Sequence, residues 1–552
     1  MNNSRILRSI GLIIVLGIFA LSLTACRNDD AGAGPGAIVV GAEGFTIPLD
    51  TVGEITVMTW SGSSTFLRDI GRRDFAPEDI AGQQDGAMIA TARAFNRYFP
   101  NVVINVYARD GDHEGAMWDM HRENVRLEHG QFPDVFWVFN LINDVQRGMV
   151  ADLTIFNDDP MYQLINPAAM DMGRIGGRTF ALPSYMLPWA IFVNRDLAER
   201  ENIDMPPINW TLDQYIQFVM NSRPNDFYGA MATLWVMRNS GLPGVDWQLA
   251  NRSDGDPWVM VNTEATRNII SMLPQINTHA VWPQNALGNI DYEFMSENGW
   301  WGMRFFANGR LLALPYDPWF LGAMAQATVD PGHWLNIGDL DWDVFPRPST
   351  PYVGNHVGVV YDPVSIRNFA MDDGDPNLSP EEYEQLALAW EFMRFKVGDT
   401  RAWAERANQR YGTGLAFAVS DSLPVVTGQA FDDQMDLWFA SGREVLRDAN
   451  RFPGLHRVFE LFEDGQFPAF SYKTVPWHFE FEGAPRTILL EWTNMWDAQF
   501  AGARDLDPHW LDELFARLPE WDVLFNERFD NEWNTMVEAM NRFYPEQVRG
   551  GR

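Results

Sequence analysis

The sequence predicts an α/β fold with parallel sheets, because short apolar runs alternate with helical patterns along the chain. Residues 55–60 (ITVMTW) are typical of a strand, since β-branched and aromatic side chains dominate the run. Apolar side chains then recur at spacings of four, three and four from residue 88 to residue 99, which is one face of a helix. Residues 102–107 and 133–139 are two further expected strands, so strand, helix and strand follow one another.

Two capping signatures mark helix starts later in the chain. Thr211 is followed three residues later by Gln214, and Ser379 is followed three residues later by Glu382. In such a box the hydroxyl accepts from a backbone N–H of the first turn, and the Glu or Gln side chain reaches back to the cap. Pro380 also suits a first helical position. We therefore expect helices that begin just after residues 211 and 379.

Composition is that of a globular protein with a strongly acidic surface. The 552 residues are 46% hydrophobic, and Asp and Glu outnumber Lys and Arg by 74 to 41, which gives a formal charge of −33. The hydrophobic fraction excludes a disordered or fibrous chain, and the length suffices for two or more domains. A surface of this charge repels phosphate backbones, so nucleic acid is excluded as an expected partner. Lys396 and Lys473 are the two lysines, and the other basic residues are arginines.

The N-terminus indicates export. Arg5 and Arg8 precede an apolar run that ends in Leu23-Thr24-Ala25-Cys26, and this run is shorter than the ~20 residues of a membrane-spanning helix. The ending resembles a bacterial lipobox, in which the signal peptide is removed before a lipidated cysteine. Cys26 is the single cysteine of the chain and so has no internal disulfide partner. A plain signal peptide with a chance cysteine, or an uncleaved anchor, is the alternative.

Residues 26–50 are rich in Gly, Ala and Asp and lack helical periodicity, so we expect a flexible tether behind the lipidated cysteine. Residues 1–25 are the expected lipoprotein signal peptide. The two arginines leave with it, and the mature formal charge becomes −33 − 2 = −35. The predicted location is the extracytoplasmic face of a bacterial cell membrane, to which only the N-terminal lipid attaches the body.

Several stretches, in order, resemble the family 1 extracellular solute-binding lipoproteins of ABC importers, which mostly carry sugars. The family's strands, turns and helices are matched by ITVMTWSG, PDVFWVF, GMVADLT, GGRTFALPSYMLPWAIFVNRDL, FFANGRLLALPYDPW, DWDVFPRPSTPYVGNHVGV and EEYEQLALAWEFMRF. The chain departs from the family pattern at Arg347-Pro348, where Leu-Pro is usual, and at Asp317-Pro318, where Gly-Pro is usual. The Trp210-Thr211 order is also inverted.

The resemblance implies a two-lobed periplasmic-binding-protein-like fold of type II, with a ligand cleft between the lobes and three hinge crossings. The implied crossings lie near residues 182–188, 351–355 and 423–428. The implied N-terminal lobe is 51–183 plus 355–424, and the implied C-terminal lobe is 186–352 plus 428–552. Such lobes close around a solute by hinge motion and then dock on a permease.

Sugars present apolar faces and hydroxyl edges, so a sugar site needs flat aromatic rings and a few polar groups. The resemblance places candidates for these roles at strand ends and at the first crossing. The candidate ligand contacts are Trp60, Ser61, Trp137, Asn140, Tyr185, Trp189, Trp235, Asp317 and Trp319. Packing in the core is the competing role for each of them.

Other chemistry has weaker support. His113, His121 and His129 recur every eight residues, which spreads them around a helix instead of converging them on a metal. The sequence also lacks the phosphate-loop and nucleophile-elbow motifs. A lipid-anchored glycan hydrolase is the main rival, because 74 acidic residues always offer two carboxylates for such chemistry. A solute-presenting subunit of a membrane sensor and a binder of a solute other than sugar are two further hypotheses.

The expected function is therefore delivery of a mono- or oligosaccharide to ABC permease subunits, without catalysis and without a cofactor or metal. The sugar is bound between the lobes and released unchanged.

Overall fold

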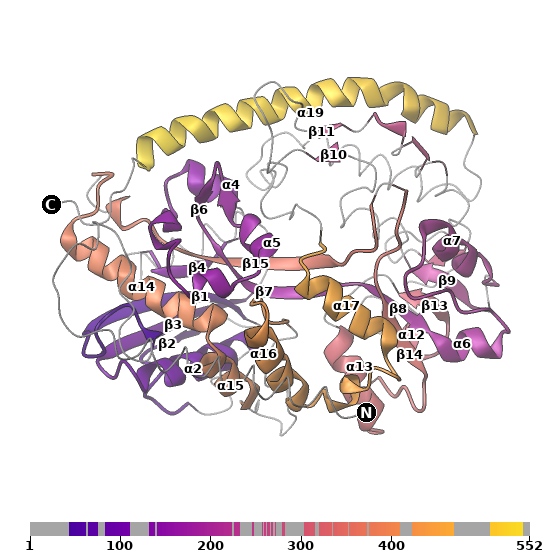
Figure 1. The fold of residues 1–552 in the computed structure, drawn as a ribbon, viewed down its shortest axis with the longest axis horizontal. Helices are drawn as coiled ribbons and strands as arrows, with labels where there is room; N and C mark the ends of the chain where they lie inside the picture. The colour runs from indigo at the N-terminus through magenta and orange to yellow at the C-terminus, as the bar shows by residue number, and fades with distance from the viewer. Residues whose placement is uncertain are drawn as a thin grey trace, which may run out of the picture. The chain divides into compact units, whose positions relative to one another are not determined.

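In the computed structural model, the described residues form two large β-sheets with helices packed against them, and two further sheets of two strands each (Figure 1). The structure describes residues 44–61, 65–75, 83–110, 132–138, 141–223, 226–231, short pieces between 246 and 281, 303–314, 320–333, 335–351, 353–371, 375–408, 422–467 and 508–544. No helix within these ranges combines the length and the apolar character that a membrane span requires.

The first sheet has six strands in the order β2-β3-β1-β4-β15-β7. β1 pairs in parallel with β3 and β4, whereas β15 is antiparallel to both β4 and β7. Two helices, α2 and α14, pack on its strands, and α15 packs on both helices; we call these three helices its helical layer. Their bounds are β1 (Gly53–Ser61), β2 (Thr65–Leu67), β3 (Val102–Asp110), β4 (Val135–Trp137), β7 (Leu182–Trp189), β15 (Gly358–Ile366), α2 (Gln83–Asn96), α14 (Pro380–Gly398) and α15 (Thr400–Asn408).

The second sheet has five strands in the order β12-β9-β13-β8-β14. Its core is aromatic: Phe192 lies 5.0 Å from Phe320 and 5.9 Å from Trp342 between ring centroids. The bounds are β8 (Ile191–Asn194), β9 (Tyr228–Met231), β12 (Ala280–Val281), β13 (Leu311–Leu314) and β14 (Trp342–Phe345), with helices α6 (Arg195–Arg200), α7 (Leu212–Met220), α12 (Met303–Ala307), α13 (Phe320–Val329) and α17 (Pro453–Glu463).

Apart from the edge strand β2, both sheets have the same arrangement of strands. Three parallel strands, β3-β1-β4 in one sheet and β12-β9-β13 in the other, are followed by one antiparallel strand and then by a last strand. The antiparallel strand comes directly after a strand of the other sheet, since β8 follows β7 and β15 follows β14. This exchange of strands between two α/β sheets confirms the predicted two-lobed α/β fold class.

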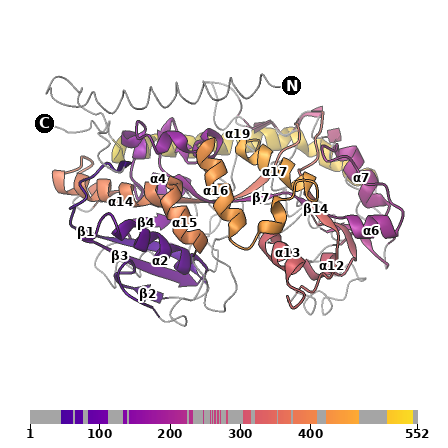
Figure 2. The ribbon, with the colours of Figure 1, turned by 60° about the horizontal axis from the view of Figure 1, so that its bottom comes forward.

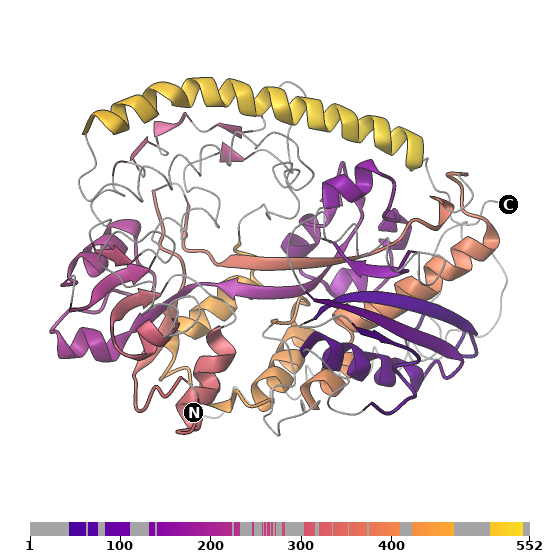
Figure 3. The ribbon, with the colours of Figure 1, turned by 180° about the vertical axis from the view of Figure 1, so that it is seen from behind.

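Two of the three expected crossings are visible as these exchanges. Only Ala190 separates β7 from β8, and residues 346–357 connect β14 to β15. β7 and β15 run side by side as a long antiparallel pair (Figure 3). At the third expected crossing, the Leu423 N–H donates to the Met186 carbonyl at 2.8 Å. From there the chain enters α16 (Gln429–Ala440) and then α17, which packs on β14 (Figure 2).

Both capping boxes predicted from the sequence are confirmed. Thr211 caps α7 and exchanges hydrogen bonds with Gln214, and Ser379 does the same with Glu382 at the start of α14. The expected helix over residues 88–99 is also present as α2, which begins at Gln83 and ends at Asn96. These local signals are read correctly because they depend only on neighbouring residues.

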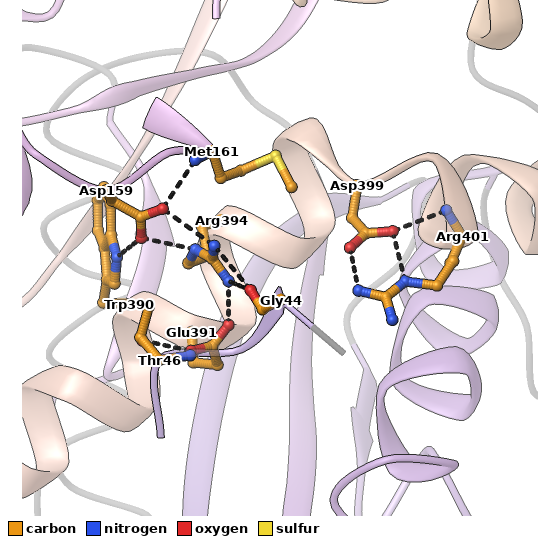
Figure 4. Close-up of polar contacts among 9 residues, drawn as sticks. All are labelled: Gly44, Thr46, Asp159, Met161, Trp390, Glu391, Arg394, Asp399 and Arg401. Atoms are coloured by element: carbon orange, nitrogen blue, oxygen red, sulfur yellow. Dashed lines mark hydrogen bonds and ion pairs between the residues drawn. The ribbon is translucent and has the colours of Figure 1, made fainter. Parts of the chain in front are cut away.

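Residues 44–46 are fastened to α14 by a buried ion network (Figure 4). The Arg394 guanidinium, 3% exposed, bonds the Asp159 carboxylate at 2.6 Å, contacts the Glu391 carboxylate and donates to the Gly44 carbonyl at 3.2 Å. The Thr46 N–H donates to Glu391 Oε2 at 2.6 Å. We call these five residues the N-terminal clamp; it holds residues 44–46 against α14.

The longest helix among the described residues, α19 (Pro508–Phe543), contacts α4 and β11 (Figure 1). Arg267 Nη2 donates to the Phe515 carbonyl at 3.1 Å, while Arg178 Nη1 donates to the Tyr544 carbonyl at 2.6 Å. The chain after α19 therefore reaches elements that precede β7. The remaining short elements include α4 (Leu141–Gln146), α5 (Pro167–Asp171), β5 (Arg174–Ile175), β6 (Arg178–Thr179), β10 (Asp246–Trp247) and β11 (Val259–Met260).

Candidate functional site at the strand crossings

The candidate site is the edge of the first sheet at which its parallel strands end. Trp60 and Ser61 close β1, where they pair with Arg109 and Asp110 at the end of β3. Trp137 closes β4, and the register of β1 against β4 places it level with residue 59. In open α/β sheets, ligands bind outside the carboxyl ends of the strands. Predicted residues of two strands, β1 and β4, therefore lie at one edge, beside the end of β3.

β7 extends this edge toward the second sheet. Trp137 and Leu182 both pair with Val364 of β15, so they are level, and β7 then continues to Trp189. Because β15 is antiparallel to both β4 and β7, β4 and β7 run in the same direction. Tyr185 and Trp189 consequently lie beyond the level at which β4 ends. The backbone of the first crossing thus carries two of the predicted ligand contacts.

The indoles of Trp137 and Trp189 are each 7% exposed. In this conformation the protein covers most of both rings, so each has a packing role as well as any role in binding. Asn140, Trp235, Asp317 and Trp319, with the lipidation candidate Cys26, lie outside the described residues, as do His113, His121 and His129. The ligand contacts as a set remain a prediction.

An arginine that sequence reasoning identifies only as a departure from the family pattern joins two crossings. Arg347 lies between β14 and β15, is 1% exposed, and donates from Nε to the Trp189 carbonyl at 2.9 Å. Its guanidinium carbon is 5.8 Å from the centroid of the Trp189 ring. Burial lowers the pKa of Arg347 to about 9.

Gly358, the first residue of β15, provides the space for this guanidinium. A Cβ at that position would lie 2.5 Å from Arg347 Nη2. The Arg347 N–H also donates to the His356 carbonyl at 2.9 Å, which turns residues 347–356 into a closed loop. The first and second crossings are therefore fastened to each other through one side chain. The sequence marked Arg347 only as a departure from the family pattern, and its contact with Gly358 depends on the fold of the loop between them.

His356 shares this environment. It is 8% exposed, and its Nδ1 lies 3.0 Å from the Gly354 carbonyl, which accepts a hydrogen bond from a protonated Nδ1. Burial and the nearby charge of Arg347 lower the pKa of His356 to about 4. The imidazole is therefore neutral at physiological pH. A proton on the ring would place a second buried charge beside Arg347 and destabilise the packing of the second crossing.

We expect His356→Gln to remove a pH dependence of stability. Between pH 6.5, the ordinary value, and about 4, the unfolded chain binds a proton that folded His356 does not bind, so wild-type stability rises with pH across this window. The wild-type minus variant difference in the free energy of unfolding should fall by about 2–3 kcal/mol from about pH 7 to about pH 4.5. Urea unfolding of both proteins measures it. An unchanged difference would show that His356 is protonated as readily in the folded body as in the unfolded chain.

The described residues contain no group of three or more His, Cys, Asp or Glu side chains arranged to hold a metal ion.

Comparisons with known proteins give likeness of structure only. No family model matches the chain, and no curated protein matches it. Similar solved structures are ABC solute-binding proteins. One is an ABC substrate-binding protein from Listeria monocytogenes in complex with cycloalternan, 14% identical, with a TM-score of 0.48, covering 89% of this chain and 100% of its own. Another is the maltose-bound MalE3 of T. maritima, 14% identical, with a TM-score of 0.47, covering 89% of this chain and 100% of its own. A third, from Thermotoga lettingae bound with α-D-tagatose, is 11% identical with a TM-score of 0.46 and covers 88% of this chain and 100% of its own.

Proposed function

We propose that this chain is the lipid-anchored, extracellular substrate-binding protein of an ABC importer, and that it binds a mono- or oligosaccharide by hinge closure. The observation that carries the proposal is the strand exchange between the two sheets, in which β8 and β15 each enter a sheet directly from the other one. Two sheets joined through such crossings are suited to hinge motion, because a few backbone torsions at the crossings reorient them.

The aromatic residues at this edge of the first sheet favour a neutral, ring-shaped solute. The indoles of Trp60, Trp137 and Trp189 belong to strands β1, β4 and β7, and the carboxyl ends of these strands point the same way. Aromatic faces bind the C–H faces of sugars and gain little from an anionic solute. The formal charge of −33 further disfavours anions.

The proposed lobes are residues 51–183 plus 355–424 and residues 186–352 plus 428–552. Closure of the lobes on a sugar shifts the population toward the closed form by the difference in affinity between the two forms. The proposed anchor is a diacylglyceryl group on Cys26 that keeps the protein beside its permease, where tethering raises its effective concentration.

The test is a thermal shift assay on the purified body with maltose, cycloalternan and tagatose among the sugars, combined with analysis of products. A raised Tm without new products supports a binding protein, because a ligand that binds only the folded state stabilises it. Products that accumulate over many turnovers would identify a hydrolase instead. No shift with any sugar would contradict the sugar class and leave a different solute as the ligand.

We expect Trp60→Ala and Trp319→Ala each to weaken binding of the sugar that gives the largest shift. Loss of one aromatic ring that stacks on the sugar should cost about 1.4 kcal/mol of binding free energy or more, which raises Kd about tenfold or more. Isothermal titration calorimetry measures Kd. Trp60→Phe and Trp319→Phe retain a smaller ring and should lose less. If both alanine variants bind as the wild type does, these two residues are not part of the site.

A further inference from the structure

A buried lysine lies between the helices and the strands of the first sheet. Lys396 lies near the end of α14, is 6% exposed, and its Nζ contacts Oγ of Ser184. Ser184 belongs to β7, the strand that continues through Ala190 into the second sheet. Lys396 therefore connects the helical layer of the first sheet to the first crossing.

A second buried cation lies beside it. Arg406 of α15 is also 6% exposed, its Nη2 donates to the Lys396 carbonyl at 2.8 Å, and its guanidinium carbon is 4.6 Å from the Trp403 ring centroid. Within the described ranges, neither Lys396 nor Arg406 forms an ion pair with a carboxylate. Two buried positive charges without a counter-charge would be costly, because burial removes the solvation of both.

Three buried carboxylates in or beside α14 are held by other arginines. Glu391 and Asp159 both contact Arg394 in the N-terminal clamp, and the Asp399 carboxylate is 2.6 Å from Arg401 Nη2. Their negative charge is therefore already compensated.

Asp362 of β15 pairs with Tyr185, one residue beyond Ser184, and Pro363 pairs with Pro183. The register of the two strands shifts between these pairs, so Ser184 lies at an irregularity of β7. Arg406 is the charged neighbour that acts on Lys396.

The type of the residue supplies a second, independent observation. Of the 41 basic residues in the chain, 39 are arginines, and one of the two lysines occupies this buried position. An arginine side chain keeps its proton in proteins, whereas a lysine loses its proton readily when buried. A position that must hold a long polar side chain without a charge can use lysine and cannot use arginine.

We propose that Lys396 is packed against Ser184 as an uncharged amine and acts as a proton sensor for the first crossing, so that protonation of Nζ weakens the packing of α14 on β7. Burial, and next the charge of Arg406, lower the pKa of Lys396 to about 7 from the ordinary 10.5. The folded body therefore binds fewer protons than the unfolded chain between these two values, and its stability rises with pH across that window.

The consequence for solute binding rests on the proposed function. β7 carries Tyr185 and Trp189, so weaker packing at Ser184 in mild acid disturbs the strand that presents both predicted ligand contacts. The protonation of Lys396 does not depend on a bound solute. Its test therefore uses the protein without any sugar, and the outcome is separate from that of the sugar panel.

The direct test uses the fact that the chain has only two lysines. Wild-type protein with ¹³C-labelled lysine gives two side-chain Cε signals in NMR, and Lys473→Arg assigns the one that belongs to Lys396. The expected result is a titration midpoint near 7. In Arg406→Met the midpoint should rise, because a neighbouring positive charge has been removed. A wild-type midpoint at the ordinary lysine value would overturn the proposal.

A second measurement distinguishes an uncharged amine from an anion site. If chloride or phosphate bound between Lys396 and Arg406, adding either salt at constant ionic strength would raise the midpoint, and the proposal would be wrong. Thermal unfolding adds a readout of packing: the wild-type Tm minus that of Lys396→Met should increase from about pH 6 to about pH 9. A constant difference would show a packing role without proton sensing.

Discussion

Arg394→Met should reduce the free energy of unfolding by about 3–5 kcal/mol, the cost of leaving buried charges without their partner. The substitution keeps an unbranched side chain but leaves the carboxylates of Asp159 and Glu391, both 0% exposed, without their cation. It also removes both donors to the Gly44 carbonyl. Urea unfolding at neutral pH, followed by far-UV circular dichroism, measures the loss.

The matched control is Arg97→Met, which removes the same type of charge from the body. Arg97 also pairs with a carboxylate, that of Glu405 at 2.5 Å, but its side chain is 60% exposed. Exposed pairs of this kind contribute about 0–1 kcal/mol. Equal losses of stability for the two variants would show that the buried ion pairs of Arg394 stabilise the protein no more than the exposed pair of Arg97. Release of residues 44–46 in Arg394→Met should also open a new site for limited proteolysis, which Arg97→Met should not do.

Asp343→Ala should lower the stability by about 2–4 kcal/mol, because it leaves several buried donors without an acceptor. The Asp343 carboxylate, 0% exposed, accepts from the Gly454 N–H at 2.9 Å and from the Leu455 N–H at 3.1 Å. These two groups belong to the first turn of α17, where N–H groups have no partner within the helix. One carboxylate of β14 thus fixes the start of the helix that packs on that strand.

Asp341→Ala is the control for this prediction, because both aspartates contact the same arginine. Arg195 Nη2 is 2.5 Å from Asp341 and Arg195 Nη1 is 3.5 Å from Asp343, but the Asp341 side chain is 51% exposed. We expect Asp341→Ala to cost no more than about 1 kcal/mol. A loss of stability for Asp343→Ala as small as that for Asp341→Ala would mean that water replaces the carboxylate at the start of α17.

Local signals in the sequence predicted the corresponding elements correctly. The hydroxyl and carboxyl groups of a capping box act over three residues, so Ser379 and Glu382 identified the start of α14 without knowledge of the fold. The strand expected over residues 55–60 is the centre of β1 for the same reason. The strand ends that carry Trp60 and Trp137 could also be placed, since parallel strands end at a common edge.

The contacts of Arg347, Asp159 and Lys396 could not be predicted in this way. Arg347 meets a carbonyl 158 positions away, and Arg394 meets Asp159 from 235 positions away. No pattern in either segment indicates the other. Lys396 was visible as a rare lysine, but its burial against Ser184 depends on how α14 packs on β7.

The sequence by itself determined which segments form strands and helices, and where several of them begin. It also determined the acidic charge and the presence of a single cysteine. Only the tertiary structure decided which buried charges are neutralised by a partner and which crossings are fastened together. The physical reason is range: helix caps and side-chain alternation act between neighbours in the chain, whereas the cost of burying a charge depends on groups that only folding brings close.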